Sequence, residues 1–389
     1  MKVKLEELPP GAFAKALGTH GANPEKLYKA LNIAMPEKVL DFSTNASVVA
    51  WNNDLSKFDW FNLARNYPDY ECIELRILIA HREGVLPENI LFVNGSNEAF
   101  YIIASYLANK RVAILQPAYS EYERALKAYN AECVDIYNLN ELANCEAIFF
   151  SNPCNPNGNY IEPDELLNLI NLNKDVLFVI DEAYIDFLLY GNKAHYDFDN
   201  LNSKFKAAHY EDNEGQNEKQ SLLINGSRVR DPGNIIVTRS LTKFYHLSGL
   251  RIGYILSSEN IINKLKARQP IWSVNAAAQA LTLEFLRDRD FELKSLEFYK
   301  RETPRFINAL KDLGYCVNDT RANFFIIDLA KSNIKDEDFI VHMLKRGVVV
   351  RHTRNFKSLN GNFVRAATRL ESENNIFIEA AREFMKNDL

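Results

Sequence analysis

Five short runs of apolar and β-branched residues recur along the 389-residue chain, with helical patterns between them. None of the five alternates between polar and apolar residues, as a strand with one solvated face would. Strands that are apolar throughout are typical of a mostly parallel sheet with helices on both faces. The runs are RVAIL (111–115), AIFFS (147–151), VLFVI (176–180), IIVTR (235–239) and IGYIL (252–256). The sequence therefore predicts an α/β fold with a doubly wound sheet.

The pattern changes after about residue 270, where a long helical stretch (276–312) leads into shorter strands and helices. The chain is also longer than the size at which one hydrophobic core usually keeps growing. We therefore expect a large domain over 61–270 and a smaller α+β domain over 271–389, with the N-terminal segment 1–60 packing on the small domain. A polar stretch at 202–221 has no clear period and is interpreted as an insertion.

Charge and cysteine content exclude several classes of function. A formal net charge of −5 argues against a protein that neutralises nucleic-acid phosphates over a broad basic face. The five cysteines are scattered without a C-x-x-C pair, so neither a disulfide framework nor a zinc site is expected. No apolar run approaches the roughly 20 residues that span a bilayer. We expect a soluble, cytoplasmic protein that binds neither membranes nor a metal ion.

Polar residues follow the predicted strands at the points where the strands end. Lys243 follows the run at 235–239, and Asp181 and Tyr184 follow the run at 176–180. Tyr119 and Asn155 follow two further runs. Ligands of open α/β sheets bind outside the carboxyl ends of the strands. Each residue alone has a plainer explanation, as a helix cap, a turn or a solvated strand end. Together they predict one binding site on this rim.

A lysine on such a rim suits covalent chemistry, because an amine with a lowered pKa forms Schiff bases with carbonyl compounds. Pyridoxal 5′-phosphate needs such a lysine, a carboxylate for its ring nitrogen and donors for its phosphate. The turn at Gly95 and Ser96 offers backbone N–H groups to an anion. Ser240 and Arg251 stand three residues before Lys243 and eight after it, and complete a plausible phosphate site.

The motifs NPCNPNG, DEAYIDF and SLTKFYHLSGLRIGY, in this order and spacing, resemble those of the fold-type I pyridoxal-phosphate enzymes, the aminotransferase superfamily. The resemblance covers nearly the whole chain. It implies that Lys243 forms the Schiff base and later carries a proton, and that Asp181 pairs with the pyridinium nitrogen. Asn155 and Tyr184 would then hydrogen-bond the 3′-oxygen of the ring, on which Tyr119 would stack.

The same resemblance implies the remaining cofactor contacts. Gly95, Ser96, Ser240 and Arg251 would hold the cofactor phosphate. Tyr67, in the stretch NYPDY, is similar to the tyrosine that reaches the neighbouring subunit's site, which implies a homodimer with shared active sites.

Within the superfamily, two groups are similar to this chain: the histidinol-phosphate aminotransferases and the L-threonine-O-3-phosphate decarboxylases of the cobalamin pathway. The N-terminal stretches THGAN and DFSTNAS resemble the decarboxylases, which implies that His20 and Asn45 bind the phosphate of a phosphorylated amino acid. The C-terminal stretches VVVRHT and NFVRAATR resemble their arginine pair. Arg351 and Arg365 would then anchor the substrate carboxylate, as a planar guanidinium does well.

The predicted activity is the decarboxylation of O-phospho-L-serine or O-phospho-L-threonine, which yields ethanolamine phosphate or 1-aminopropan-2-yl phosphate. The serine substrate is slightly preferred, because the bulk of Val48, Val49 and Trp51 is expected to reshape the substrate end of the pocket. The first alternative is an aminotransferase of the histidinol-phosphate type. A second is a cofactor-binding regulator, but no basic helix-turn-helix extension is visible in the sequence.

Overall fold

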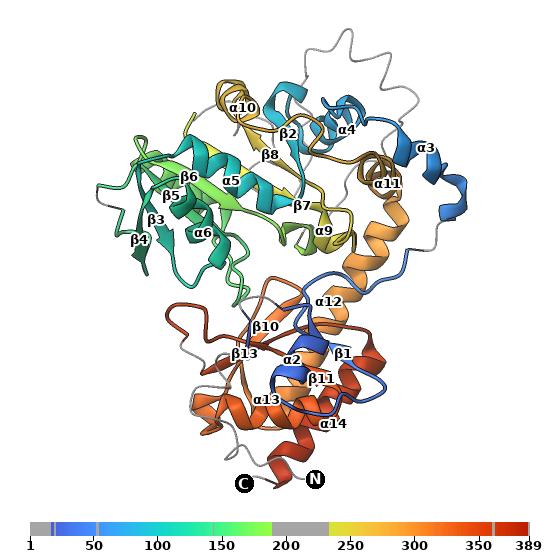
Figure 1. The fold of residues 1–389 in the computed structure, drawn as a ribbon. Helices are drawn as coiled ribbons and strands as arrows, with labels where there is room; N and C mark the ends of the chain where they lie inside the picture. Colours follow the sequence, from blue (N-terminus) through green and yellow to red (C-terminus); the bar gives the residue numbers. More distant parts are fainter. Residues whose placement is uncertain are drawn as a thin grey trace.

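The computed structural model describes residues 17–18, 21–51, 54–142, 144–188, 233–359 and 362–387. Its largest sheet has seven strands in the order β2-β8-β7-β6-β5-β3-β4. The strands are β2 (Ile90–Val93), β3 (Arg111–Leu115), β4 (Glu132–Ile136), β5 (Ala147–Ser151), β6 (Leu177–Asp181), β7 (Ile235–Ser240) and β8 (Gly253–Ser257). Neighbouring strands are parallel, except that β8 runs antiparallel to both β2 and β7. Figure 1 shows this sheet with helices on its two faces, so the predicted fold class is confirmed.

Both faces of the large sheet are buried, which explains why its strands are apolar throughout. In β5, Ile148 and Phe150 belong to one core cluster, and Ala147 and Phe149 belong to another on the opposite face. The helices that cover the first face include α4 (Ile73–Glu83), α7 (Pro163–Leu172) and α11 (Ala276–Arg287). Those on the second face are α5 (Ser96–Tyr106), α6 (Ser120–Ala128) and α10 (Glu259–Lys266).

The second domain is built on an antiparallel sheet in the order β12-β13-β10-β9. These strands are β9 (Cys316–Val317), β10 (Phe324–Asp328), β12 (Arg351–His352) and β13 (Phe363–Ala367), and they pack with α13 (Asp336–Lys345) and α14 (Glu371–Asn387). The helix α12 (Arg289–Asp312) runs from the large domain into this smaller one (Figure 1). The N-terminal strand β1 (Leu40–Asp41) pairs in parallel with β11 (Val348–Val349).

Shorter elements complete the described chain. They are α2 (Pro24–Ala30), η2 (Leu55–Lys57), α3 (Trp60–Arg65), η3 (Pro87–Asn89), η4 (Ile185–Phe187), α9 (Leu241–Phe244) and η5 (Ala330–Ser332). No helix in the described ranges combines the length and the apolar character that crossing a membrane requires. The predicted insertion at 202–221 lies outside the described residues.

Candidate active site

The strand register aligns polar side chains at one end of the large sheet. Ser151 at the end of β5 lies opposite Asp181 at the end of β6, and Asp181 lies opposite Thr238 in β7. The chain then leaves β7 through α9, which carries Lys243 as a half-buried side chain. Because β5, β6 and β7 are parallel, their carboxyl ends meet at this edge, and the loops after them meet there too.

Asp181 is a buried carboxylate held by three neutral donors. Its Oδ2 atom accepts a 2.6 Å hydrogen bond from the hydroxyl of Tyr122, and its Oδ1 atom accepts from the N–H of Ala183 at 3.0 Å and the hydroxyl of Thr238 at 3.3 Å. Burial raises the pKa of Asp181, while these hydrogen bonds and the charge of Lys243 act in the opposite direction. A buried carboxylate of this kind suits a cationic ligand atom.

Tyr122 was not among the predicted site residues, although it stands one helical turn after Tyr119. Tyr119 is the N-cap residue of α6, and the two aromatic rings meet edge to face with centroids 5.7 Å apart. The i, i+3 spacing on a helix that opens at the sheet edge was the available signal, because such residues share a face. The burial of Tyr119 raises the pKa of its phenol, which keeps this ring neutral.

A second group of residues forms a cradle where β2, β7 and β8 meet. Gly253 pairs with both Val93 and Ser240, so the turn after β2 lies beside the end of β7. A Cβ atom on Gly95, whose φ is +75°, would lie 2.5 Å from Nη2 of Arg251. Only glycine therefore lets this guanidinium lie against the backbone at the start of α5. Ser96 opens that helix, whose free N–H groups attract anions.

Tyr184 and Asn155 lie near residues from distant parts of the chain. The hydroxyl of Tyr184 accepts a 3.3 Å hydrogen bond from Nδ2 of Asn45, while Oδ1 of Asn45 is buried without a hydrogen-bond partner. Oδ1 of Asn155 accepts a 2.6 Å bond from Nη1 of Arg365. Because this oxygen is already engaged, the amide nitrogen of Asn155 is the group that can donate to a ligand.

Arg351 and Arg365 face each other across the pairing of β12 with β13. Arg365 donates to the carbonyl of Ser43 at 2.7 Å, and its buried Nε atom has no hydrogen-bond partner. Arg351 donates to Asn355 at 2.7 Å and to the carbonyl of Gly18 at 3.4 Å. Burial, together with the charge of Arg365, lowers the pKa of Arg351 to about 9. Two buried cations side by side favour an anionic ligand.

Two expected positions, Tyr67 and Trp51, lie apart from this cluster, and a third, His20, lies outside the described residues. Tyr67 is 80% exposed and stacks on Trp272, with ring centroids 4.4 Å apart. Trp51, which was expected to reshape the pocket, instead stacks on Phe285 at 3.8 Å and donates to Asp288 at 2.9 Å, so its indole belongs to the core around α11.

The described residues fit pyridoxal 5′-phosphate on three independent grounds. Asp181 is a buried carboxylate that a protonated ring nitrogen would neutralise. The close contact of Gly95 with Arg251 leaves backbone donors and a guanidinium for a phosphate. The unpartnered polar atoms of Asn45 and Arg365 are buried beside Tyr184 and Asn155, where a ligand would meet them.

Comparisons with known proteins point to one family. The family described as aminotransferase class I and II matches residues 38–380. The threonine-phosphate decarboxylase of Salmonella typhimurium is 26% identical in an alignment that covers 94% of this chain and 96% of that protein. The histidinol-phosphate aminotransferase of Caldicellulosiruptor saccharolyticus is also 26% identical, over 90% of this chain and 92% of its own.

Among solved structures, the L-threonine-O-3-phosphate decarboxylase of Porphyromonas gingivalis superposes with a TM-score of 0.71 and is 27% identical. The match covers 88% of this chain and the whole of that one. Relatives named for either activity share nearly the same sequence identity with this chain. Identity alone therefore does not decide between decarboxylase and aminotransferase.

Proposed function

Because the chain belongs to the aminotransferase class I and II family, whose members depend on pyridoxal 5′-phosphate, we propose that it decarboxylates an O-phosphorylated hydroxyamino acid. Lys243 would bind the cofactor aldehyde, and Asp181 the ring nitrogen. Gly95, Ser96 and Arg251, with Ser240, would hold its phosphate. Bound in this way, the cofactor supplies an electron sink for a bond that breaks at Cα.

The observation that carries this proposal is the pair of buried guanidiniums, Arg351 and Arg365. A simple amino acid brings one carboxylate, which a single bidentate arginine binds. A phosphorylated amino acid brings a carboxylate and a phosphate, and two cations suit these two groups. Motif resemblance assigned both arginines to the carboxylate. Because they are two separate cations in register, we instead propose Arg365, which donates to Asn155, for the carboxylate and Arg351 for the second anionic group.

His20 and Asn45 are proposed to assist at the substrate phosphate. Arg351 contacts the carbonyl of Gly18. Holding the substrate at both ends restricts rotation about its bonds to Cα. Binding energy at the phosphate is thereby used to orient the bond to the carboxylate, which is the bond to be broken. Lys243 would then deliver a proton to Cα from its Nζ atom.

The choice between the serine and threonine substrates depends on whether the pocket has room for one additional methyl group. Since Trp51 and Val49 both pack against the core cluster around α11, the bulk that favours O-phospho-L-serine reduces to Val48, which is half-buried. An additional methyl group changes selectivity by about 1–3 kcal/mol in a hydrophobic pocket. We propose O-phospho-L-serine as the slightly better substrate and expect O-phospho-L-threonine to react as well.

The alternative is transamination of a phosphorylated substrate, as in the relatives named histidinol-phosphate aminotransferase. The two reactions differ in one requirement, because transamination needs a keto acid as amino acceptor. The test supplies cofactor-loaded enzyme with each phosphoamino acid, without a keto acid, and follows the products by ³¹P NMR. Catalytic formation of ethanolamine phosphate or 1-aminopropan-2-yl phosphate supports the proposal. Turnover that begins only when 2-oxoglutarate is added contradicts it.

We further propose that the enzyme is a homodimer in which Tyr67 contributes to the partner's site. Tyr67 stacks on Trp272, and several large apolar side chains near these two residues in the sequence are exposed at the surface, a feature that often marks a protein interface. These side chains are Phe61, Tyr70, Ile73, Ile271 and Trp272. A second copy covering this surface would bury them and bring each Tyr67 to the neighbouring molecule.

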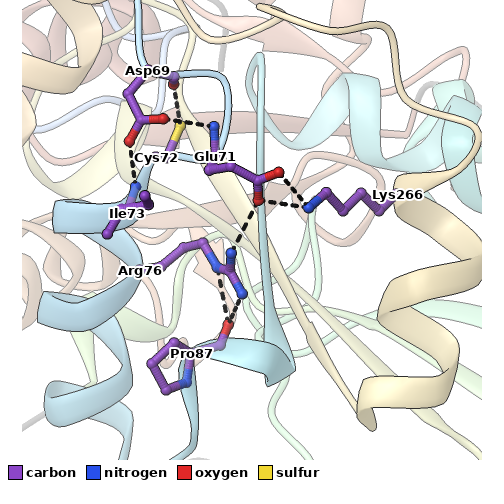
Figure 2. Close-up of polar contacts among 7 residues, drawn as sticks. All are labelled: Asp69, Glu71, Cys72, Ile73, Arg76, Pro87 and Lys266. Carbon is purple, nitrogen blue, oxygen red and sulfur yellow. Dashed lines mark hydrogen bonds and ion pairs between the residues drawn. The ribbon is translucent and has the colours of Figure 1, made fainter. Parts of the chain in front are cut away.

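The turn that follows Tyr67 is anchored at several points, which suits a residue that must be presented to a partner. The carboxylate of Asp69 accepts from the N–H groups of Glu71 and Ile73 at 2.9 and 2.7 Å (Figure 2). The carboxylate of Glu71 in turn accepts from Lys266 at 2.5 Å and from Arg76 at 3.3 Å. The turn is therefore tied to both α4 and α10.

A further inference from the structure

The segment 43–49 connects the two halves of the site. Its first residues are held by the small domain: the carbonyl of Ser43 accepts from Arg365 at 2.7 Å, and the carbonyl of Asn45 accepts from Nδ2 of Asn323 at 3.0 Å. Arg365 lies on β13, and Asn323 immediately precedes β10. The beginning of the segment therefore has to follow the position of the small-domain sheet.

The other end of the segment is bonded to the lysine itself. The N–H of Ser47 donates a 2.7 Å hydrogen bond to the backbone carbonyl of Lys243. The same carbonyl also accepts from two N–H groups that follow α9, that of Tyr245 and, at 3.4 Å, that of His246. Lys243 lies on α9, a helix of four residues, and a helix this short gains little from its own hydrogen bonds. Contacts from outside α9 must therefore fix where the lysine backbone lies.

Tyr299 of α12 holds the segment at this end. Its hydroxyl donates to Oγ of Ser47 at 3.2 Å and accepts from the N–H of Val48 at 2.8 Å. Burial raises the pKa of Tyr299 to about 12, so the hydroxyl keeps its proton over the working range of pH. Ser47 is fully buried, and Tyr299 is 3% exposed. Water is therefore poorly placed to replace these hydrogen bonds.

The ring of Tyr299 is also packed toward α9. It meets the ring of Phe187 edge to face with centroids 5.0 Å apart, and Phe187 meets Phe244, the residue after Lys243, at 5.3 Å. Two routes therefore connect Tyr299 with the lysine, one through the hydrogen bonds of Ser47 and one through aromatic packing. Replacing tyrosine by phenylalanine breaks the first route and keeps the second.

We propose that Tyr299 is a positioning residue for Lys243, acting through Ser47, and that segment 43–49 couples the substrate anchor Arg365 to the lysine. The proposal rests on the proposed function, in which Lys243 binds the cofactor and Arg365 the substrate carboxylate. A carboxylate that binds Arg365 acts on a side chain already bonded to Ser43. Four residues later, the N–H of Ser47 is bonded to the carbonyl of Lys243. The backbone of one segment thus connects the proposed substrate anchor with the lysine.

The test compares Tyr299→Phe with Tyr28→Phe. Tyr28 is 2% exposed, its pKa is likewise raised to about 12, and its hydroxyl donates to the carbonyl of Leu344 at 2.7 Å, within the small domain. Both substitutions remove a buried hydroxyl, so both are expected to lower the melting temperature. Only Tyr299→Phe should lower kcat, on the order of tenfold, with KM changed less than about twofold.

A spectroscopic reading separates positioning from general loss of stability. The visible absorbance of the cofactor-loaded enzyme is titrated with pH in the absence of substrate. The midpoint should move in Tyr299→Phe and stay in place in Tyr28→Phe, because only the former changes the surroundings of the lysine. This measurement uses no substrate, so an error in the assigned reaction leaves it unaffected, whereas an error about Lys243 would be seen as visible absorbance that persists in Lys243→Ala.

Ser47→Ala provides a second variant, which keeps the backbone N–H and removes the hydroxyl that Tyr299 contacts. The midpoint of its absorbance titration should shift in the same direction as that of Tyr299→Phe and by a smaller amount. If Tyr299→Phe does not fold, Ser47→Ala is the variant that tests the proposal. Midpoints and kcat values that match the Tyr28→Phe control in both variants would overturn the proposal.

Discussion

The large-domain half of the site and the small-domain half are assembled in different ways. In the large domain, Asp181 ends β6 and Lys243 lies three residues after the end of the adjacent strand β7, so strand pairing brings them together. In the small domain, Arg365 gains its position from contacts with Ser43 and Asn155, which are 322 and 210 residues away in the chain. The cofactor half thus depends on local motifs, and the substrate half depends on how distant segments pack.

This difference implies that substitutions can impair the function of one half without impairing that of the other. Substitutions in the cofactor half should affect every substrate alike, and substitutions in the substrate half should spare cofactor binding. The following predictions test this separation, beginning with the largest expected effect.

Lys243→Ala should reduce activity more than about a thousandfold, because it removes the amine proposed to bind the cofactor and to carry the proton. The visible absorbance of the loaded enzyme should disappear as well. Borohydride reduction followed by peptide mass analysis checks the assignment in the wild type. Cofactor attached to another lysine would show that the cofactor half is centred elsewhere.

Arg365→Lys should lower kcat/KM about 100-fold, or about 3 kcal/mol, because an ammonium cannot provide the planar, bidentate contact of a guanidinium. Cofactor absorbance should be retained. Arg354→Lys is the control, since Arg354 pairs with Asp336 and Glu337 in the same domain. Loss of cofactor from the Arg365→Lys enzyme would show that the two halves are not separable.

Asp181→Asn should stabilise the cofactor-free protein above the pH range in which aspartates ordinarily titrate. Because burial raises the pKa of Asp181 in the folded state, its contribution to stability is complete below the ordinary value, about 3.9, and is lost as pH rises through the raised value. At pH 8 the variant should be more stable by about 1 kcal/mol, and this difference should narrow as pH falls.

Urea unfolding of both cofactor-free proteins across this pH range measures the effect. Adding the cofactor should reverse the order of stability, because only the wild-type carboxylate can neutralise a cationic ring nitrogen. A wild type that is the more stable protein at every pH without cofactor would contradict the account of the cofactor half.

Lys357→Met should have the smallest effect. Lys357 of the small domain bridges Asp135 at 2.7 Å and Glu123 at 3.0 Å, both in the large domain, and its side chain is 39% exposed. KM should rise about twofold to threefold at low ionic strength, and the difference should vanish in high salt. Lys331→Met is the control, because Lys331 pairs with Asp328 inside the small domain. An equal change of KM in both variants would exclude a role of Lys357 in the contact between the two domains.

The sequence revealed most of the residues proposed for the cofactor half, because they follow apolar runs that are strands in the structure. Asp181, Asn155 and Lys243 are examples. The direction of β8 was not predictable, since an apolar run has the same composition in either direction. Tyr122 was missed because its bond to Asp181 joins residues 59 apart, and helical spacing alone does not say which face meets the sheet edge.

The small-domain half was harder to predict in detail. Two arginines were expected there from motif resemblance, but not that Arg351 and Arg365 would lie directly opposite each other, which depends on strand register. Ser47 and Tyr299, 252 residues apart, carry no local pattern that marks them as neighbours. Trp51 was interpreted as a pocket residue because bulk in a sequence does not reveal toward which core a side chain points.

The measurement that tests the central claim most directly follows the carboxyl carbon of the substrate. O-phospho-L-serine labelled with ¹³C at the carboxyl carbon is incubated with the cofactor-loaded enzyme, with and without 2-oxoglutarate. The account predicts that the label is released as CO₂ at the same rate in both reactions, in step with ethanolamine phosphate. Label that remains in a phosphorylated keto acid, formed only when 2-oxoglutarate is present, would contradict it.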